Sequence, residues 1–151
     1  MNHADTNWLT AMFFTRHQPE RTATAARFMR QQSGPLGVSH IVLLEAENVF
    51  RRNAGTASPS ELEELRGAGF YRDPMNWDLV RRNTLALLQR YAHKTTLGTF
   101  DMAVLASAQL AGATRFLSFD ETIKAVAVAE GMEVFPPLGD EGRQILAALR
   151  R

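Results

Sequence analysis

Residues 97–136 read LGTFDMAVLASAQLAGATRFLSFDETIKAVAVAEGMEVFP, and the order of elements in this stretch decides the fold. The apolar run from Arg115 to Phe119 is typical of a buried strand. The alanine-rich segment from Glu121 to Glu130 predicts a helix that ends at Gly131, and a second short strand follows at Glu133 to Phe135. Because strands joined by one helix are normally parallel, the stretch predicts an open parallel sheet.

Two acids in this stretch hold related positions. Asp101 lies near the start of a predicted helix, and Asp120 directly follows the first strand. Open parallel sheets bind ligands outside the carboxyl ends of their strands, so both carboxylates are candidates for one cleft. Either acid alone can instead cap a helix, because Asp is a favoured N-cap and a negative charge is stabilised near a helix start. The sequence leaves both interpretations open.

The N-terminal third shows the same arrangement. Asp5 ends a short strand and precedes a helix that extends from Thr6 to about Arg16. A second strand at Leu36 to His40 leads into a helix from Ile41 to Arg52, whose second turn carries Glu45. A half-buried carboxylate at that position needs a partner or a metal ion, which helix capping does not provide.

The remaining predicted elements are a helix opened by Pro19, a helix opened by the capping box from Ser58 to Glu61, a loop or short extended segment over 67–74, and helices over 78–93 and 140–151. Trp8 and Trp77 are expected to anchor the core. A chain of 151 residues is long enough for one domain with a real core. We therefore predict a single domain over residues 1–151, with a helical hairpin inserted at about 58–93.

The composition narrows the possible chemistry. The chain has no cysteine, which excludes disulfides, thiolate zinc sites and a cysteine nucleophile. Its four histidines show no ligand spacing, so no zinc site is predicted. Fifteen of the 17 Lys and Arg residues are Arg, which suits phosphate contacts but also an ordinary solvated surface. Without a signal peptide or a long apolar run, the chain is expected to be soluble and cytoplasmic.

Four acids from separate segments are predicted to meet at one edge of the sheet: Asp5, Glu45, Asp101 and Asp120. Converging carboxylates raise one another's pKa unless a cation neutralises them. Hard oxygen ligands of this kind suit Mg²⁺ or Mn²⁺. Thr6 and Ser118, next to these acids, could order a bound water, although hydroxyls at strand ends are more often backbone caps.

Four ordered segments resemble the PIN domain family, and within it the VapC-type toxins of bacterial toxin-antitoxin pairs. They are the segments at 4–7 (ADTN), 44–48 (LEAEN), 100–108 (FDMAVLASA) and 116–120 (FLSFD). The resemblance spans nearly the whole chain. It implies a three-layer α/β/α sandwich with a central parallel sheet and a divalent-metal site at the carboxyl edge of that sheet.

The resemblance also implies roles for single residues. Asp5, Glu45 and Asp101 match the family's core metal-binding acids, Asp120 its more variable fourth acid, and Ser118 its Thr/Ser position. Asn7 and Asn48 are expected to support the site. Glu47 competes with Glu45, but only Glu45 keeps the Glu-x-x-Asn spacing. At Thr99 and Val104 the chain departs from the subgroup, where many relatives carry Arg and His.

These features lead to the hypothesis of a Mg²⁺- or Mn²⁺-dependent endoribonuclease in which the ion activates water for in-line attack on a phosphodiester. Single-stranded or loop RNA is the expected substrate, because the groove must receive an exposed backbone. Phosphate contacts are guessed at Arg51, Arg52, Arg81 and Arg82. A small antitoxin partner and a homodimer through exposed apolar residues of the two middle helices are expected from the resemblance.

Three alternatives remain. The domain could be a solitary RNA-processing nuclease without an antitoxin, or a catalytically degenerate module that binds RNA or a protein. A phosphohydrolase of the Asp-x-Asp type is disfavoured, because position 7 is Asn where that chemistry needs a second Asp.

Overall fold

A computed structural model describes residues 1–53 and 55–151, in which short strands alternate with helices. The strands are β1 (Asn2–Ala4), β2 (Gly37–Val38), β3 (Tyr71–Arg72), β4 (Arg115–Leu117) and β5 (Glu133–Phe135). The helices are α1 (Thr6–Phe13), α2 (Pro19–Arg30), α3 (His40–Arg52), α4 (Pro59–Gly67), α5 (Trp77–Tyr91), α6 (Thr99–Leu110), α7 (Glu121–Ala129) and α8 (Asp140–Leu149). No helix in these two ranges is long and apolar enough to cross a membrane.

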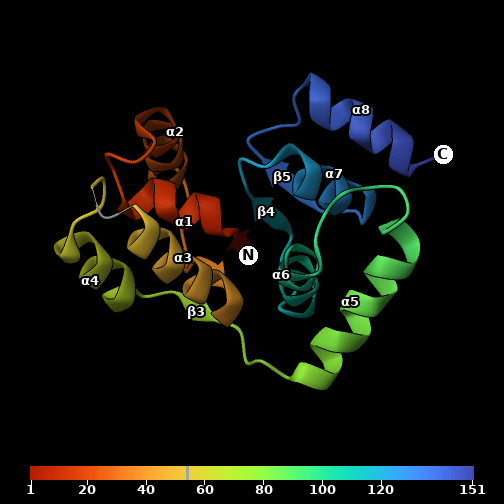
Figure 1. Ribbon diagram of the computed structural model, residues 1–151, viewed down its shortest axis with the longest axis horizontal. Coiled ribbons are helices and arrows are strands. Elements are labelled where there is room, and N and C mark those ends of the chain that lie inside the picture. Colours follow the sequence, from red (N-terminus) through yellow and green to blue (C-terminus); the bar gives the residue numbers. More distant parts are fainter. Residues whose placement is uncertain (54) are drawn as a thin grey trace.

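The five strands form one parallel sheet in the order β3-β2-β1-β4-β5. The chain moves in one direction from β1 to β3 and in the other from β4 to β5. Right-handed crossovers therefore place α1 to α4 on one face and α5 to α7 on the other, as Figure 1 shows. The predicted α/β fold with a central parallel sheet between helical layers is confirmed. The strand order reverses between β1 and β4, which is where such sheets bind ligands.

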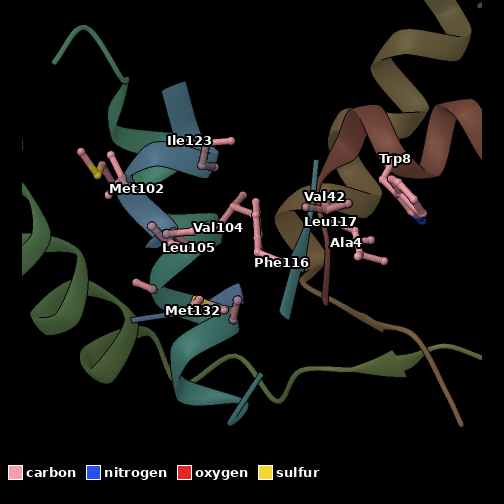
Figure 2. Close-up of a cluster of buried hydrophobic side chains, with 14 of the residues drawn as sticks. Ala4, Trp8, Val42, Met102, Val104, Leu105, Phe116, Leu117, Ile123 and Met132 are labelled. Carbon is pink, nitrogen blue, oxygen red and sulfur yellow. The ribbon is translucent and has the colours of Figure 1, made fainter. Parts of the chain in front are cut away.

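Side chains of the central strands alternate between the two helical layers. Phe116 points toward Val104 and Leu105 of α6, whereas Leu117 points toward Val42 of α3 (Figure 2). All of these side chains are fully buried. Burying one large apolar side chain contributes roughly 1.5–3 kcal/mol to the stability of the fold. Side chains on both faces of the sheet therefore hold the adjacent strands β1 and β4 in place.

Local sequence signals explain several element boundaries. The capping box at Ser58 and Glu61 is confirmed, with each residue bonding the backbone of the other. Gly131 adopts the predicted left-handed conformation with φ +88°. The segment 67–74 contains β3, which pairs with β2, so residues 58–93 hold α4 and α5 with a strand of the sheet between them.

The two tryptophans have different environments. Trp8 is fully buried, as expected. The prediction for Trp77 was wrong, since 62% of its surface is exposed. Trp77 is the first residue of α5, so it lies at the end of the helix, before the buried residues that begin at Val80.

A buried polar contact crosses the sheet near β1. The His3 Nε2 lies 2.7 Å from the Asp73 Oδ2, with both residues buried, and so links β1 to the segment after β3. Strand β2 runs between them, and its Gly37 leaves room for the imidazole, because a Cβ there would lie 2.9 Å from the His3 Cδ2. This contact fixes β1 relative to the edge of the sheet.

Candidate metal centre

The four predicted acids line one cleft at the carboxyl edge of the sheet. Asp5 directly follows β1, and Asp120 lies three residues beyond β4, on the two sides of the point where the strand order reverses. Glu45 reaches the cleft from α3 on one face of the sheet, and Asp101 reaches it from α6 on the other. The fold thus brings together carboxylates from four separate segments.

Asp5 is the most enclosed of the four, with 6% of its surface exposed. Its Oδ1 accepts a hydrogen bond from the Thr6 backbone N–H at 2.8 Å, and its Oδ2 accepts one from the Ser118 hydroxyl at 2.8 Å. Burial raises the pKa of Asp5 from 3.8 to about 7, because these two bonds only partly offset the loss of water and the charges of Asp101 and Glu45 raise it further. None of the ion pairs in the described residues, 1–53 and 55–151, includes Asp5.

Glu45 and Asp101 are half-buried. Burial raises the pKa of Glu45, which the hydrogen bond from the Thr6 hydroxyl at 3.0 Å partly counters and the charge of Asp101 reinforces. Burial and the charge of Asp120 likewise raise the pKa of Asp101. Asp101 is the third residue of α6, whose N-cap is Gly98, so Asp101 is not the N-cap, although it lies in the first turn, where the helix dipole favours a negative charge.

Asp120 behaves differently. Its Oδ1 accepts hydrogen bonds from the backbone N–H groups of Thr122 and Ile123 at 2.7 and 3.1 Å, so it caps α7 as the capping interpretation anticipated. It is exposed, yet it lines the same cleft, and its charge acts on Asp101. Asp120 can therefore cap α7 and also belong to the site, because it caps with Oδ1 and still lines the cleft.

Asn7 and Ser118 connect the turns after β1 and β4. The Ser118 hydroxyl donates to Asp5 and accepts the Asp120 backbone N–H at 3.0 Å. The Asn7 side chain donates to the Ser118 Oγ at 3.2 Å and accepts the Phe119 backbone N–H at 3.0 Å. These bonds hold Asp5 and Asp120 in a defined relation to each other.

Several other predicted residues lie outside this cleft: Asn48, Arg51, Arg52, Arg81 and Arg82. On α3 the cleft is lined by Glu45 and Val49, because at 100° per residue a position four along is closer to the same face than a position three along. Asn48 is exposed instead. Glu47, the competitor of Glu45, pairs with Arg66 at 2.7 Å. The four arginines do not line this cleft, so phosphate contacts at these positions stay a prediction.

Besides Thr10 and Val49, sequence reasoning missed three residues that line the cleft: His17, Gln18 and Arg21. They belong to the connection between α1 and α2 and to the first turns of α2. No spacing relates them to the acids, so the packing of α2 against α1 was needed to place them.

The ligand atoms in the cleft suit a hard divalent cation. All four acids offer oxygen, and no Lys or Arg forms an ion pair with them in residues 1–53 and 55–151. The same residues contain no group of three acidic, histidine or cysteine side chains already close enough to hold an ion. Like charges keep carboxylates apart, and a bound cation would both offset that repulsion and lower the raised pKa values.

Comparison with protein-family models identifies one family. The model of the PIN domain family matches residues 4–129. No curated protein matches the chain by sequence.

Solved structures resemble the fold at low identity. VapC20 from Mycobacterium tuberculosis, described as a toxin that cleaves the sarcin-ricin loop, is 18% identical with a TM-score of 0.66, covering 83% of this chain and 94% of its own. FitAcB from Neisseria gonorrhoeae is 15% identical with a TM-score of 0.63, covering 91% and 98% respectively. PAE2754 from Pyrobaculum aerophilum is 16% identical with a TM-score of 0.56, covering 99% of this chain and 94% of its own.

Proposed function

This chain belongs to the PIN domain family, and from that premise we propose that it is a divalent-metal-dependent endoribonuclease. The observation that carries the proposal is the single cleft lined by Asp5, Glu45, Asp101 and Asp120. Structural acids in a protein are normally paired with cations or hydrogen-bond donors. Here burial and mutual repulsion raise the pKa of three of the four, which is the condition that a bound Mg²⁺ or Mn²⁺ would relieve.

The chain's own residues would divide the work. Asp5, Glu45 and Asp101 would hold the cation, and Asp120 would complete its surroundings from the exposed side of the cleft. Ser118 and Thr6 would orient the carboxylates of Asp5 and Glu45 through their hydroxyl hydrogen bonds. The cation, when bound, would supply an activated water and offset charge on the leaving oxygen. No side-chain nucleophile is required.

Single-stranded or looped RNA is the proposed substrate. The cleft lies at an exposed sheet edge, where an unpaired backbone can reach acids that a duplex would hold at a distance. VapC20, which shares the fold, is described as cleaving the sarcin-ricin loop, and this supports a looped substrate here.

The direct test is cleavage of a mixed RNA pool with and without Mn²⁺ by the wild type and by Asp101→Asn. Mn²⁺-dependent cleavage by the wild type and its loss in Asp101→Asn are expected. The control is Asp140→Asn, which changes an exposed acid in the first turn of α8 and should cleave like the wild type. Cleavage that persists in Asp101→Asn would contradict the proposed site.

One observation favours a second candidate, a degenerate module that binds RNA or protein without catalysis. Among residues 1–53 and 55–151 the acids do not form a preassembled group of three ligands. This candidate predicts neither RNA cleavage nor a rise in thermal stability on addition of Mn²⁺, whereas the nuclease must show both.

We further propose that the nuclease acts as a toxin held in check by a small antitoxin. The support is the likeness in fold to VapC20, which is described as a toxin. Expression of the chain alone should arrest growth, Asp5→Asn should abolish the arrest, and a neighbouring reading frame should restore growth. Cleavage without growth arrest, and without such a neighbour, would indicate a solitary RNA-processing nuclease instead.

A homodimer is proposed through the apolar groove between α5 and α6, where Trp77, Leu85 and Phe100 are 62%, 53% and 73% exposed. Exposed apolar residues gathered at one groove are typical of an interface. Light scattering should give a dimer mass for the wild type and a monomer mass for Leu85→Asp. Leu44→Asp, which changes an exposed leucine of a different surface on α3, is the matched control and should remain dimeric.

A further inference from the structure

The acid-lined cleft also contains a guanidinium that the metal site does not use. Arg21, in the first turns of α2, lines the cleft together with His17 and Gln18. Arg21 is half-buried rather than extended into solvent. None of the ion pairs found in residues 1–53 and 55–151 includes Arg21, although carboxylates line the same cleft.

An aromatic stack holds Arg21 in place. Its guanidinium carbon lies over the Phe119 ring, 5.1 Å from the ring centroid. Phe119 in turn stacks on the fully buried Trp8, with centroids 5.3 Å apart and an interplanar angle of 18°. The Phe119 backbone N–H donates to the Asn7 side chain, so the platform is fixed to the same turn that supports the acids. Arg21 therefore has a defined position over Phe119, the residue between Ser118 and Asp120 in the sequence.

The stacked guanidinium is suited to one class of ligand. An arginine that rests on an aromatic ring keeps its N–H donors in the plane of the group, where they match two oxygens of a phosphate. Gln18 and His17 line the cleft with it and offer further hydrogen-bonding groups. In contrast, Arg51, Arg52, Arg81 and Arg82 do not line this cleft.

We propose that Arg21, seated on Phe119, is the residue that binds a backbone phosphate of single-stranded RNA beside the metal centre. The proposal rests on the proposed nuclease function and assigns a substrate contact inside the cleft, which Arg51, Arg52, Arg81 and Arg82 do not line. The acids hold the cation at one part of the cleft, and Arg21 fixes the polynucleotide at another. Its contribution is to affinity and register, so it changes KM more than kcat.

The test compares Arg21→Met, Arg21→Lys and Arg27→Ala. Methionine keeps an unbranched apolar stem on Phe119 without the charge, and lysine keeps the charge without the planar fork. Arg27 is an exposed arginine of the same helix that does not line the cleft. With a fluorescent single-stranded RNA and Mn²⁺, Arg21→Met should raise KM roughly 10-fold with kcat within about 2-fold, as expected for the loss of one charge-assisted phosphate contact. Arg21→Lys should lie between, and Arg27→Ala should match the wild type.

A binding measurement separates this proposal from the nuclease function. Fluorescence anisotropy with the same RNA, without metal and with Asp101→Asn as the common background, gives affinity as a function of salt. Loss of one phosphate contact should reduce the slope of log affinity against log salt by about 0.7 in Arg21→Met and leave it unchanged in Arg27→Ala. If Arg21→Met and Arg27→Ala share the same KM and the same slope, the proposal is overturned even though cleavage stands. If the wild type cleaves no RNA, the nuclease function fails, and the salt slope still decides the role of Arg21.

Discussion

Two carboxyl groups with little exposure to water, the half-buried Glu130 and the buried Asp5, have opposite surroundings. Glu130, at the end of α7, accepts hydrogen bonds from Arg90, Tyr91 and Gln109 at 2.6, 2.5 and 3.0 Å. Burial alone would raise the pKa of Glu130, but these donors outweigh it and lower the pKa. For Asp5 the balance is reversed, since burial outweighs two hydrogen bonds and raises the pKa to about 7.

The comparison shows how a protein distinguishes a structural acid from one that awaits a ligand. Glu130 receives its positive charge from within the chain, and its ion pair with Arg90 links α5 to the end of α7. Asp5, Glu45 and Asp101 face one another across a cleft, and each raises or is raised by another of the set. We propose that the missing positive charge comes from outside the chain, as the hard divalent cation that oxygen ligands suit.

The largest expected difference between the two groups is in catalysis. Asp5→Asn should lower Mn²⁺-dependent RNA cleavage by at least about 100-fold, beyond the effect typical of residues that only support a metal ligand. Glu130→Gln should cleave within about 3-fold of the wild type, because its contacts lie away from the cleft. Initial rates at saturating RNA measure both. Equal losses of cleavage rate in the two variants would show that Asp5 and Glu130 do not differ in their role in catalysis.

Stabilisation by bound metal should depend on the acids of the cleft and not on Glu130. Mn²⁺ at about 100 times its dissociation constant should stabilise the folded wild type by about 2.7 kcal/mol. Glu45→Gln should lose most of this gain, whereas Glu130→Gln should retain it. Thermal unfolding with and without Mn²⁺ gives the values. A full gain in Glu45→Gln would mean that the ion binds elsewhere.

Without metal, the two groups should respond to pH in opposite directions. The folded pKa of Asp5, about 7, exceeds its ordinary value of 3.8, so the folded state holds a proton in this window that the unfolded state releases. Stability from this group is complete below about pH 3.8 and is lost as the pH rises to about 7. In EDTA at about pH 8, Asp5→Asn should therefore be more stable than the wild type, by on the order of 2 kcal/mol.

Denaturant titrations at about pH 4 and about pH 8 check this sign. The advantage of Asp5→Asn should be small at the lower pH, where the wild-type carboxyl is already protonated. A variant that is less stable than the wild type at the higher pH would show that the Ser118 and Thr6 hydrogen bonds outweigh the cost of burying the charge.

Glu130→Gln should show the smallest effect, with the reverse sign. A lowered folded pKa means that the charged form stabilises the folded state above the ordinary value of 4.5, and that this stability is lost as the pH falls through the folded pKa. The variant should be less stable than the wild type by about 1 kcal/mol near neutral pH, and the difference should narrow on acidification. A constant difference at every pH would attribute the loss to packing rather than charge.

The sequence allowed much of the sheet and of the acidic site to be predicted for local reasons. The run at Arg115 to Phe119 and the helix that ends at Gly131 carry their own signals of strand and cap. The positions of Asp5 and Asp120 just after strands placed them at one sheet edge without knowledge of any contact. By contrast, β3 is two residues long and exposed, and its pairing depends on the neighbouring strand, so 67–74 could be described only as a loop or short extended segment.

The order of strands, helices and acids along the chain determined by itself the parallel sheet and the family, because hydrophobic period, caps and short motifs are local properties of a sequence. Only the tertiary structure decided which side chains share the cleft. It brought Arg21 onto Phe119 and turned Asn48 and Glu47 away, since these outcomes depend on how α2 and α3 pack and rotate against the sheet. Helix rotation and long-range packing are set by many distant contacts at once, and no single stretch of sequence encodes them.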